Sequence, residues 1–267
     1  MIEAVAAWAE ERPDVRAALL VGSRARTIEP ADEWSDYDFV LLLEDPQPYV
    51  DDAGWLSAFG RPLLTFLEPT AVGGFVERRV LFDSGQDADF ALLPAAAAEL
   101  LGHPDVAMVF GRGYRVLADR AGVGPRIRSA ASVPIRSDTA YAQLTNDFWY
   151  HAILAAKKLR RGELFVAKQT CDGYLKALAV QLLAWRAAPG TDTWHGGRFV
   201  DRWADPEDLR ELGAAYARYD AEDVARALWA TVDLFERLEQ EIGRPPAVPH
   251  EEVRQHLAEL LPRGYLP

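Results

Sequence analysis

The chain has 267 residues, 49% of them hydrophobic, which is enough to build one large or two ordinary domains around a buried core. Its 29 lysines and arginines against 41 aspartates and glutamates give a formal net charge of -12. This charge argues against a general nucleic-acid binder, which normally presents a basic face. It favours attraction of cationic small molecules, with mere solubility as the alternative.

The single cysteine, Cys171, excludes an intrachain disulfide, and no zinc-type spacing of cysteine and histidine is present. The five histidines show no ligand spacing and are expected to be structural or solvent-exposed. Residues 1–11 lack a basic start and a long apolar run, so they do not resemble a signal peptide. No run of about 18 apolar residues predicts a transmembrane helix. We therefore expect a cytoplasmic protein that acts without a membrane or nucleic acid, with a monomer as one option for its oligomeric state.

The first half of the chain alternates between short helical and strand patterns. Helices are predicted at 2–11, from Arg24 to a break at Glu29-Pro30, at 55–59 and at 95–101, and strands at 15–21, 36–43, 63–67, 75–82, 87–93, 106–110 and 114–118. Beyond residue 137 the pattern becomes helical, at 138–161, 163–187, 206–218, 221–242 and 249–261. We therefore predict an α+β protein with an N-terminal domain at 1–131, a mixed β-sheet flanked by helices, and a C-terminal helical bundle at 132–267.

The strand at 15–21 is followed by Gly22-Ser23 and then by a helical pattern. A glycine lets a phosphate approach the backbone, and amides at a helix start favour anions. The serine hydroxyl adds a hydrogen-bond donor. Taken alone this is a weak signal, since Gly-Ser is common in loops.

Asp36 and Asp38 open the next apolar strand, and residues two apart in a strand point to the same face. Two adjacent carboxylates are unfavourable unless a positive charge lies between them, and a divalent metal is the natural candidate. The combination of an apolar strand, Gly-Ser, a helix and Asp-x-Asp before a second strand is more specific than either half. It predicts a site of metal-dependent nucleotidyl transfer.

A third acid, Asp89, stands at the head of the strand at 87–93. Phosphoryl transfer with two metal ions requires several carboxylates. Asp36 and Asp38 would then bridge both ions, and Asp89 would bind the ion nearer the nucleophile. Asp87 has the same spacing and stays a rival ligand. Magnesium suits such an all-oxygen site, where a hydroxyl would attack the α-phosphorus and release pyrophosphate.

These residues resemble the nucleotidyltransferase superfamily related to DNA polymerase β. The long gap between Gly22-Ser23 and Asp36 is similar to the aminoglycoside 6-adenylyltransferase (streptomycin adenylyltransferase) family. Further similar stretches cover about residues 15 to 260, among them 19–38, 81–89, 116–120, 146–149, 161–172, 197–199 and 230–235.

The resemblance implies transfer of AMP from ATP, with Mg²⁺, to a hydroxyl of an aminoglycoside. It implies that Gly22, Ser23 and Arg24 contact the triphosphate, as would Lys168 from the helical half. The metal ligands would be Asp36, Asp38 and Asp89. Asp172 lies four residues after Lys168 on one helix face and is the candidate general base. The alternative for this last pair is an ordinary i,i+4 ion pair.

The sequence departs from the family where it is short between Glu68 and Arg79, and where Arg198 replaces a common lysine. Neither departure affects the metal ligands, but both bear on the acceptor. A different acceptor therefore stays open, such as a lincosamide, another metabolite or a protein. A non-catalytic nucleotide-binding protein is the alternative from another class.

Overall fold

The structure, a computed structural model, describes residues 1–26, 31–71, 73–127, 137–188, 190–191, 193, 197–245 and 249–265. The chain forms two compact units, residues 1–132 and 133–267. The predicted boundary between residues 131 and 132 lies outside the described residues. One unit carries a mixed β-sheet and the other is helical, which confirms the predicted α+β class.

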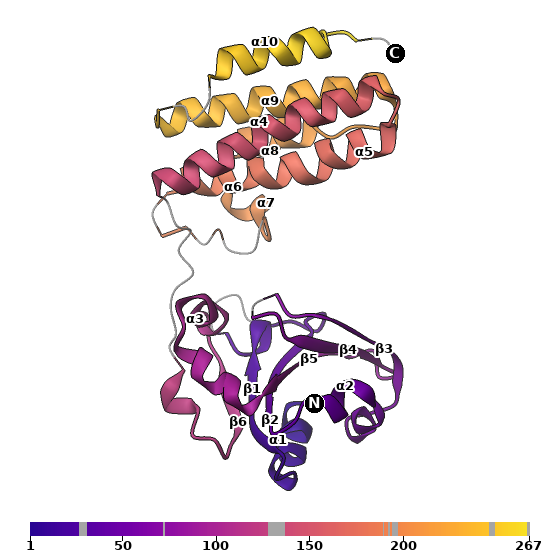
Figure 1. Ribbon diagram of the computed structural model, residues 1–267, viewed down its shortest axis with the longest axis vertical. Coiled ribbons are helices and arrows are strands. Elements are labelled where there is room, and N and C mark those ends of the chain that lie inside the picture. Colours follow the sequence, from indigo (N-terminus) through magenta and orange to yellow (C-terminus); the bar gives the residue numbers. More distant parts are fainter. Residues whose placement is uncertain are drawn as a thin grey trace. The chain divides into compact units, whose positions relative to one another are not determined.

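The N-terminal unit is built on one six-stranded sheet with the order β3-β4-β5-β2-β1-β6, in which only β2 and β5 pair in parallel (Figure 1). Its strands are β1 (Val15–Val21), β2 (Tyr37–Leu43), β3 (Pro62–Pro69), β4 (Val76–Phe82), β5 (Asp87–Pro94) and β6 (Arg115–Asp119). The helices are α1 (Ile2–Glu11), α2 (Gln47–Asp51) and α3 (Pro104–Phe110), with short 3-10 segments η1 (Gly22–Arg24), η2 (Gly54–Ala58), η3 (Ala95–Gly102) and η4 (Gly124–Arg126).

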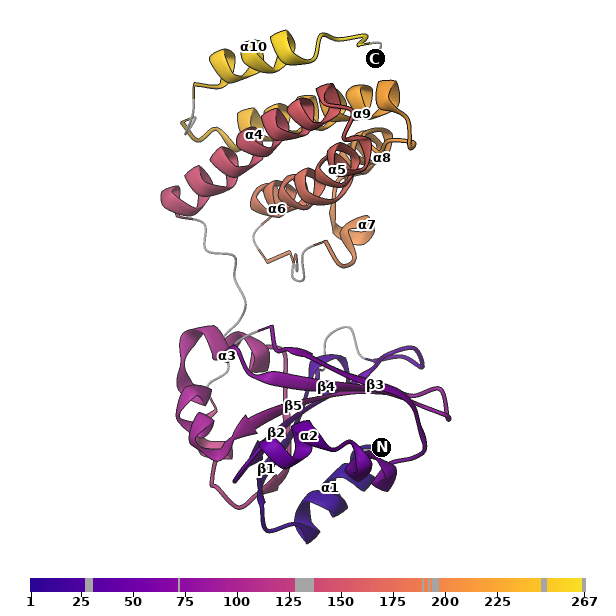
Figure 2. The same cartoon turned by 45° about the vertical axis from the view of Figure 1, so that its right-hand side comes forward.

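Alternation along β2 divides its side chains between two separate cores. Phe39 and Leu41 pack with α1, α2 and η2, where Trp8 belongs to the buried cluster. Val40 and Leu42 pack on the opposite face with η3 and α3 (Figure 2). Asp38 shares the parity of Val40, so its side chain belongs to this second face of the sheet.

Two predictions for this unit fail. The predicted strand at 106–110 is the helix α3, which begins at a proline, a residue well suited to the first helical position. Its apolar residues Val106, Val109 and Phe110 recur at helical spacing and belong to the core on this face of the sheet. The helix predicted from Arg24 is a 3-10 turn that ends at Arg24, and the predicted break at Glu29-Pro30 lies outside the described residues.

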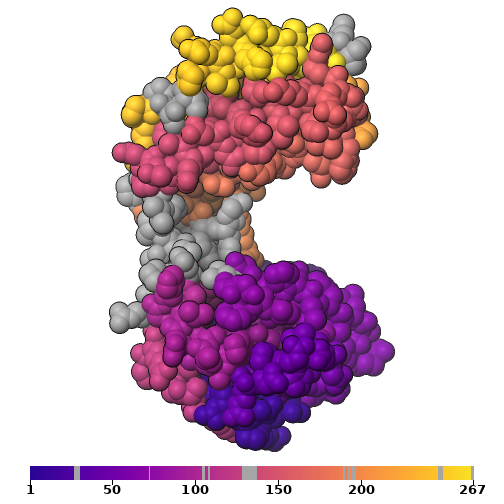
Figure 3. Space-filling view, viewed as in Figure 1, coloured from indigo at the N-terminus to yellow at the C-terminus, as the bar shows by residue number. Residues whose placement is uncertain are grey.

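The C-terminal unit consists of helices around a single apolar core. These are α4 (Asp138–Arg160), α5 (Leu164–Gln169), the π-helical turn η5 (Thr170–Leu175), α6 (Lys176–Arg186), α7 (Val200–Trp203), α8 (Pro206–Ala214), α9 (Ala221–Ile242) and α10 (His250–Leu260). The atoms of α10 lie directly against those of α4 in the space-filling view (Figure 3). None of the helices in the described ranges is both long and apolar enough to cross a bilayer.

Local signals fix the ends of the long helices. The Ser137 hydroxyl accepts a hydrogen bond from the Ala140 amide at the start of α4. Asp220 caps α9 in the same way through the Asp223 amide, and Gly243 ends α9 in the left-handed conformation. The helix predicted over 163–187 is instead interrupted by the π-helical turn between α5 and α6.

A buried carboxylate lies between α4, α9 and α10. Glu239 is only 5% exposed, with His250 Nδ1 3.5 Å from its Oε2 atom. Burial raises the pKa of Glu239 to about 7, and the polar hydrogens of Trp149 and Tyr141 oppose this only in part. The folded unit therefore favours the neutral acid.

This burial predicts a pH-dependent stability. Between the ordinary pKa of about 4.5 and the folded value of about 7, the unfolded chain binds fewer protons than the folded chain, so stability falls as the pH rises. Glu239→Gln removes the charge, and we expect it to raise the free energy of unfolding at pH 8 by roughly 2–3 kcal/mol relative to the native chain. Urea unfolding followed by circular dichroism at pH 5 and pH 8 measures the difference.

Glu259→Gln is the matched control, because this side chain on α10 is exposed. It should change stability equally little at both pH values. A Glu239→Gln protein that is no more stable than the native chain at pH 8 would contradict the buried-acid interpretation.

Candidate active site

The turn after β1 brings the backbone of Gly22 against the carboxylate of Asp38. Val21 and Asp38 are cross-strand partners in the β1–β2 ladder, so the turn lies beside the start of β2. Gly22 has φ of +67°, and a Cβ atom there would lie 1.9 Å from Asp38 Oδ2. Both the conformation and the contact require glycine at this position.

Ser23 and Arg24 complete the turn in different ways. Ser23 is 5% exposed, and its hydroxyl has no hydrogen-bonding partner within the part of the chain that the structure describes. A buried hydroxyl without a partner indicates a missing ligand or water. Arg24 donates from Nε to the carbonyl oxygens of Ser35 at 3.1 Å and Asp36 at 3.0 Å, and its guanidinium covers the Tyr37 ring at 3.9 Å. The predicted triphosphate contact of Arg24 is not tested, but here it positions the segment that carries Asp36.

Three carboxylates converge at the start of β2 and β5. Asp38 and Asp89 face each other in the parallel β2–β5 register, and Asp36 directly precedes β2. Each of these three residues offers an oxygen within 4.8 Å of the others, a grouping that can hold a metal ion. The structure places Asp89 in this group, whereas Asp87 lies exposed at the first position of β5.

The proximity of these acids changes how they bind protons. Burial raises the pKa of Asp38 to about 7, and the charges of Asp36 and Asp89 add to this effect. Burial also raises the pKa of Asp89 to about 6, which the guanidinium of Arg79 partly opposes. The site thus disfavours its own negative charge, which a bound divalent cation would reverse.

Sequence reasoning missed Arg79, which lies beside this triad. It is the cross-strand partner of Asp89 in the β4–β5 ladder, with Nη2 3.4 Å from Asp89 Oδ2. The same Nη2 lies 3.1 Å from Glu77 Oε1, and Nε lies 2.5 Å from Glu68 Oε1. The alternation of β4 puts Glu77 and Arg79 on one face, but only the register of β3, β4 and β5 reveals the contact with Asp89.

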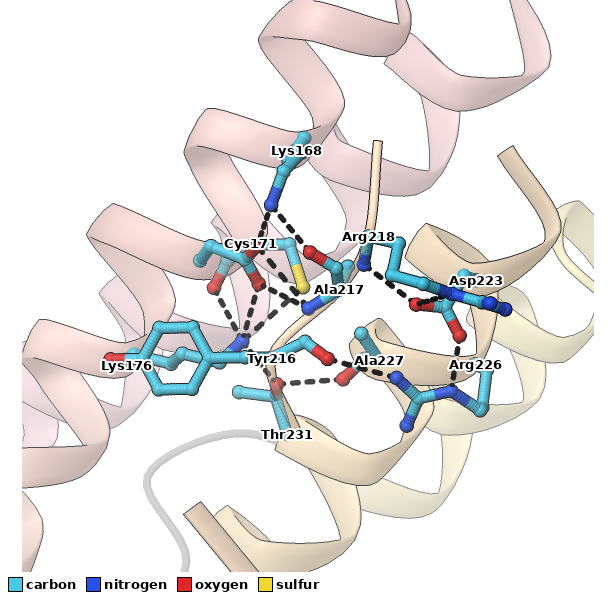
Figure 4. Close-up of polar contacts among 11 residues, drawn as sticks. Lys168, Cys171, Lys176, Tyr216, Ala217, Arg218, Asp223, Arg226, Ala227 and Thr231 are labelled. Carbon is cyan, nitrogen blue, oxygen red and sulfur yellow. Dashed lines mark hydrogen bonds and ion pairs between the residues drawn. The ribbon is translucent and has the colours of Figure 1, made fainter. Parts of the chain in front are cut away.

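Lys168 lies in a network of polar contacts in the helical unit (Figure 4). Asp172 is its ion-pair partner there. They form an i,i+4 ion pair, and Lys176 Nζ lies 3.0 Å from Asp172 Oδ1. The Ala217 amide donates to both oxygens of Asp172 at 3.3 Å, while Lys168 donates to the Ala217 carbonyl oxygen at 2.7 Å. These hydrogen bonds connect the segment between α8 and α9, which contains Ala217, to α5 and the π-helical turn.

The contacts of Asp172 bear on its predicted role as a general base. Burial acts to raise its pKa, but hydrogen bonds from Lys168 and Lys176 outweigh it and lower the pKa. A carboxylate with occupied oxygens and a lowered pKa is a weak proton acceptor. The geometry therefore favours the ion-pair alternative for Lys168 and Asp172, and their catalytic roles remain predictions.

The N-terminal constellation has the parts that a nucleotide–metal site requires. Three carboxylate oxygens suit a hard divalent cation. The unpartnered Ser23 hydroxyl beside the glycine turn suits a phosphate oxygen. Such an arrangement can neutralise and orient a nucleoside triphosphate for displacement at phosphorus.

Comparisons with known proteins point to the same chemistry. The aminoglycoside 6-adenylyltransferase of Bacillus subtilis is 22% identical over 246 residues, which cover 86% of this chain and 84% of that protein. The enzyme of the same name from Campylobacter jejuni is 25% identical over 181 residues, covering 64% of this chain and 60% of that protein.

Two solved structures are similar at lower levels. An aminoglycoside 6-adenyltransferase from Bacillus subtilis covers 97% of both chains, with 17% identity and a TM-score of 0.46. A nucleotidyltransferase-like protein from Exiguobacterium sibiricum covers 89% of this chain and 73% of that chain, with 12% identity and a TM-score of 0.36. The family model of streptomycin adenylyltransferase matches residues 1–259, nearly the whole sequence. The chain is therefore a nucleotidyltransferase that belongs to the streptomycin adenylyltransferase family.

Proposed function

We propose that this enzyme transfers AMP from ATP to a hydroxyl group of an aminoglycoside antibiotic and releases pyrophosphate. The observation that carries the proposal is the convergence of Asp36, Asp38 and Asp89 beside the Gly22-Ser23 turn in a chain of this family. The names of the two curated relatives, both aminoglycoside 6-adenylyltransferases, support the choice of acceptor. The formal net charge of -12 suits a polycationic substrate.

The turn after β1 is assigned to the triphosphate. Gly22 lets the Asp38 carboxylate lie against the turn, and the buried hydroxyl of Ser23 gains a partner in a phosphate oxygen. Arg24 holds the chain before β2 through backbone carbonyl oxygens and so fixes Asp36 against the turn. Orientation of the α-phosphorus is then largely set before the acceptor arrives.

Asp36, Asp38 and Asp89 are assigned as ligands of Mg²⁺, which when bound neutralises the charge of the triphosphate and of the leaving pyrophosphate. The acceptor hydroxyl oxygen forms the new bond to the α-phosphorus. The bond from that phosphorus to the bridging oxygen of pyrophosphate breaks, and the hydroxyl proton passes to a base or to water. Arg79 restrains Asp89 by pairing with one of its oxygens.

The activity is tested by pyrophosphate release from ATP and Mg²⁺ in the presence of a panel of aminoglycosides and lincosamides. We expect turnover with at least one aminoglycoside, and a loss of at least about 100-fold for Asp89→Asn because a ligand and its charge are removed. The matched control is Asp87→Asn, which removes the same charge at the exposed start of the same strand. It should retain nearly full activity.

The outcomes separate the parts of the proposal. Turnover with a lincosamide alone would replace the acceptor class and keep the reaction. A folded protein that binds ATP but transfers AMP to no acceptor would contradict the function. Equal losses in the two variants would contradict the assignment of Asp89.

The raised pKa values of Asp38, about 7, and Asp89, about 6, predict that protons compete with the metal. Between pH 6 and pH 8 both acids lose their protons, so we expect the apparent affinity for Mg²⁺ or Mn²⁺ to rise by roughly 10- to 20-fold. Calorimetric titration of the nucleotide-free protein at the two pH values measures it. An affinity that does not change with pH would contradict the ligand assignment, and Asp38→Asn should remove most of the change.

Gly22→Ala should abolish metal binding and transfer, because its Cβ atom would displace the Asp38 carboxylate. Because alanine disfavours the left-handed conformation of this residue, the substitution should also lower the free energy of unfolding by about 1 kcal/mol. Gly122→Ala is the control, since Gly122 has a similar φ of +62° and open space around its Cβ position. It should lose similar stability but retain metal binding. If the two variants bind Mn²⁺ equally well in calorimetry, the contact between Gly22 and Asp38 has no role in the site.

A further inference from the structure

A cluster of polar and aromatic side chains on α4 and the neighbouring turn η5 has no role in the proposed chemistry. Asp147 accepts hydrogen bonds from the Tyr174 hydroxyl, at 2.8 Å to Oδ2 and 3.1 Å to Oδ1. His151 Nδ1 lies 2.6 Å from Asp147 Oδ1, one helical turn away. The rings of His151 and Tyr174 lie 4.3 Å apart, and Tyr150 packs edge-on against His151 at 5.2 Å. We call Asp147, Tyr150, His151 and Tyr174 the α4 platform.

The α4 platform is accessible although it adjoins the core. Tyr150 is 67% exposed and Tyr174 44%, and the Asp147 side chain is 36% exposed. The intervening residues Phe148 and Trp149 are buried. Exposed aromatic rings grouped with a carboxylate are typical of binding surfaces rather than of packing.

The π-helical turn η5 supplies Tyr174 to this surface. A regular helix was expected over residues 163–187, but the extra residue of a π-turn changes the direction of the side chains within it. Asp172 from the same turn pairs with Lys176, while Tyr174 donates to Asp147 on α4. π-Helical turns interrupt the regular hydrogen bonding of a helix and occur frequently at functional sites. The presence of η5 therefore independently supports a functional role for Tyr174.

Asp147 differs in its partners from four strongly paired acids of the helical unit. Asp172 pairs with two lysines, whereas Asp208, Asp223 and Asp233 each pair with two arginines. Over the residues that the structure describes, the side-chain partners of Asp147 are Tyr174 and His151, neither of which is permanently charged. Its negative charge is therefore available to an incoming cation.

We propose that the α4 platform binds a protonated amino or guanidino group of the acceptor, with Asp147 as its carboxylate partner. The exposed rings of Tyr174 and Tyr150 offer apolar area to the adjoining sugar ring. His151 holds the carboxylate in place through Nδ1. This assignment rests on the proposed function and names the contact that selects cationic acceptors.

The test uses the full chain and the aminoglycoside that the wild-type protein turns over fastest. We expect Asp147→Asn to raise the KM for that drug by about tenfold or more, since a charge-assisted contact is lost. The KM for ATP and the affinity for Mn²⁺ should stay unchanged. Tyr174→Leu, which keeps the carboxylate, should raise the drug KM by a smaller factor.

A matched control and a modified drug sharpen the result. Asp138→Asn removes the same charge from the same helix at a side chain that is 98% exposed, and it should leave the drug KM unaltered. The fully N-acetylated drug lacks the cations, so its binding in calorimetry should be weak and should not differ between wild-type protein and Asp147→Asn.

Each outcome decides between distinct conclusions. Unchanged drug KM in folded Asp147→Asn and Tyr174→Leu proteins would overturn the platform and leave the proposed function intact. A parallel rise in the KM for ATP would indicate a structural defect and would also overturn it. Absence of transfer to any aminoglycoside by the wild-type protein, with transfer to an uncharged acceptor, would refute both the platform and the drug assignment.

Discussion

The close approach of the Asp38 carboxylate to Gly22 is the constraint on which the site depends. It exists because β1 and β2 pair with Val21 opposite Asp38, and because the turn has no side chain at that point. The parallel pairing of β2 with β5 then brings Asp89 to the same place. A shift of one residue in either ladder would move these carboxylates to opposite faces of the sheet. The site therefore forms only in the observed strand register.

Electrostatics explains why such an arrangement indicates a ligand. Burial and mutual repulsion raise the pKa of Asp38 and Asp89, which means that the ionised acids destabilise the folded state. Arg79 offsets part of the charge from the side of β4. A divalent cation would offset far more, and the Ser23 hydroxyl, which has no partner among the described residues, would add a contact for a phosphate oxygen. In the helical unit Asp208 and Asp223 pair with arginines, whereas Asp147 has only His151 and Tyr174 as side-chain partners among the described residues.

The strands that carry the site could be predicted from the sequence, because Asp36, Asp38 and Asp89 each stand at the head of a strongly apolar run. The roles of residues from other strands could not. Arg79 contacts Asp89 only through the β4–β5 register, which sequence periodicity does not contain. The apolar run that follows Asp89 favoured it over the rival Asp87, and the grouping with Asp36 and Asp38 in three dimensions agrees with that preference.

The helical half was predictable in its long helices and less so in its details. A 3.6-residue period finds α4 and α9, but it does not detect a single π-helical turn between α5 and α6. The i,i+4 spacing of Lys168 and Asp172 was equally compatible with catalysis and with an ion pair, and the additional contact with Lys176 favours the latter. His151 had no ligand spacing in the sequence, since its partner Tyr174 comes from a distant segment.

Crystals grown with Mn²⁺ and an ATP analogue that cannot be cleaved between the α- and β-phosphates test the nucleotide–metal assignment most directly. Anomalous difference maps should show manganese bound by Asp36, Asp38 and Asp89, with a phosphate oxygen within hydrogen-bonding distance of the Ser23 hydroxyl. Manganese bound elsewhere, or a triphosphate remote from the Gly22 turn, would contradict the assignment of this site as the centre of adenylyl transfer.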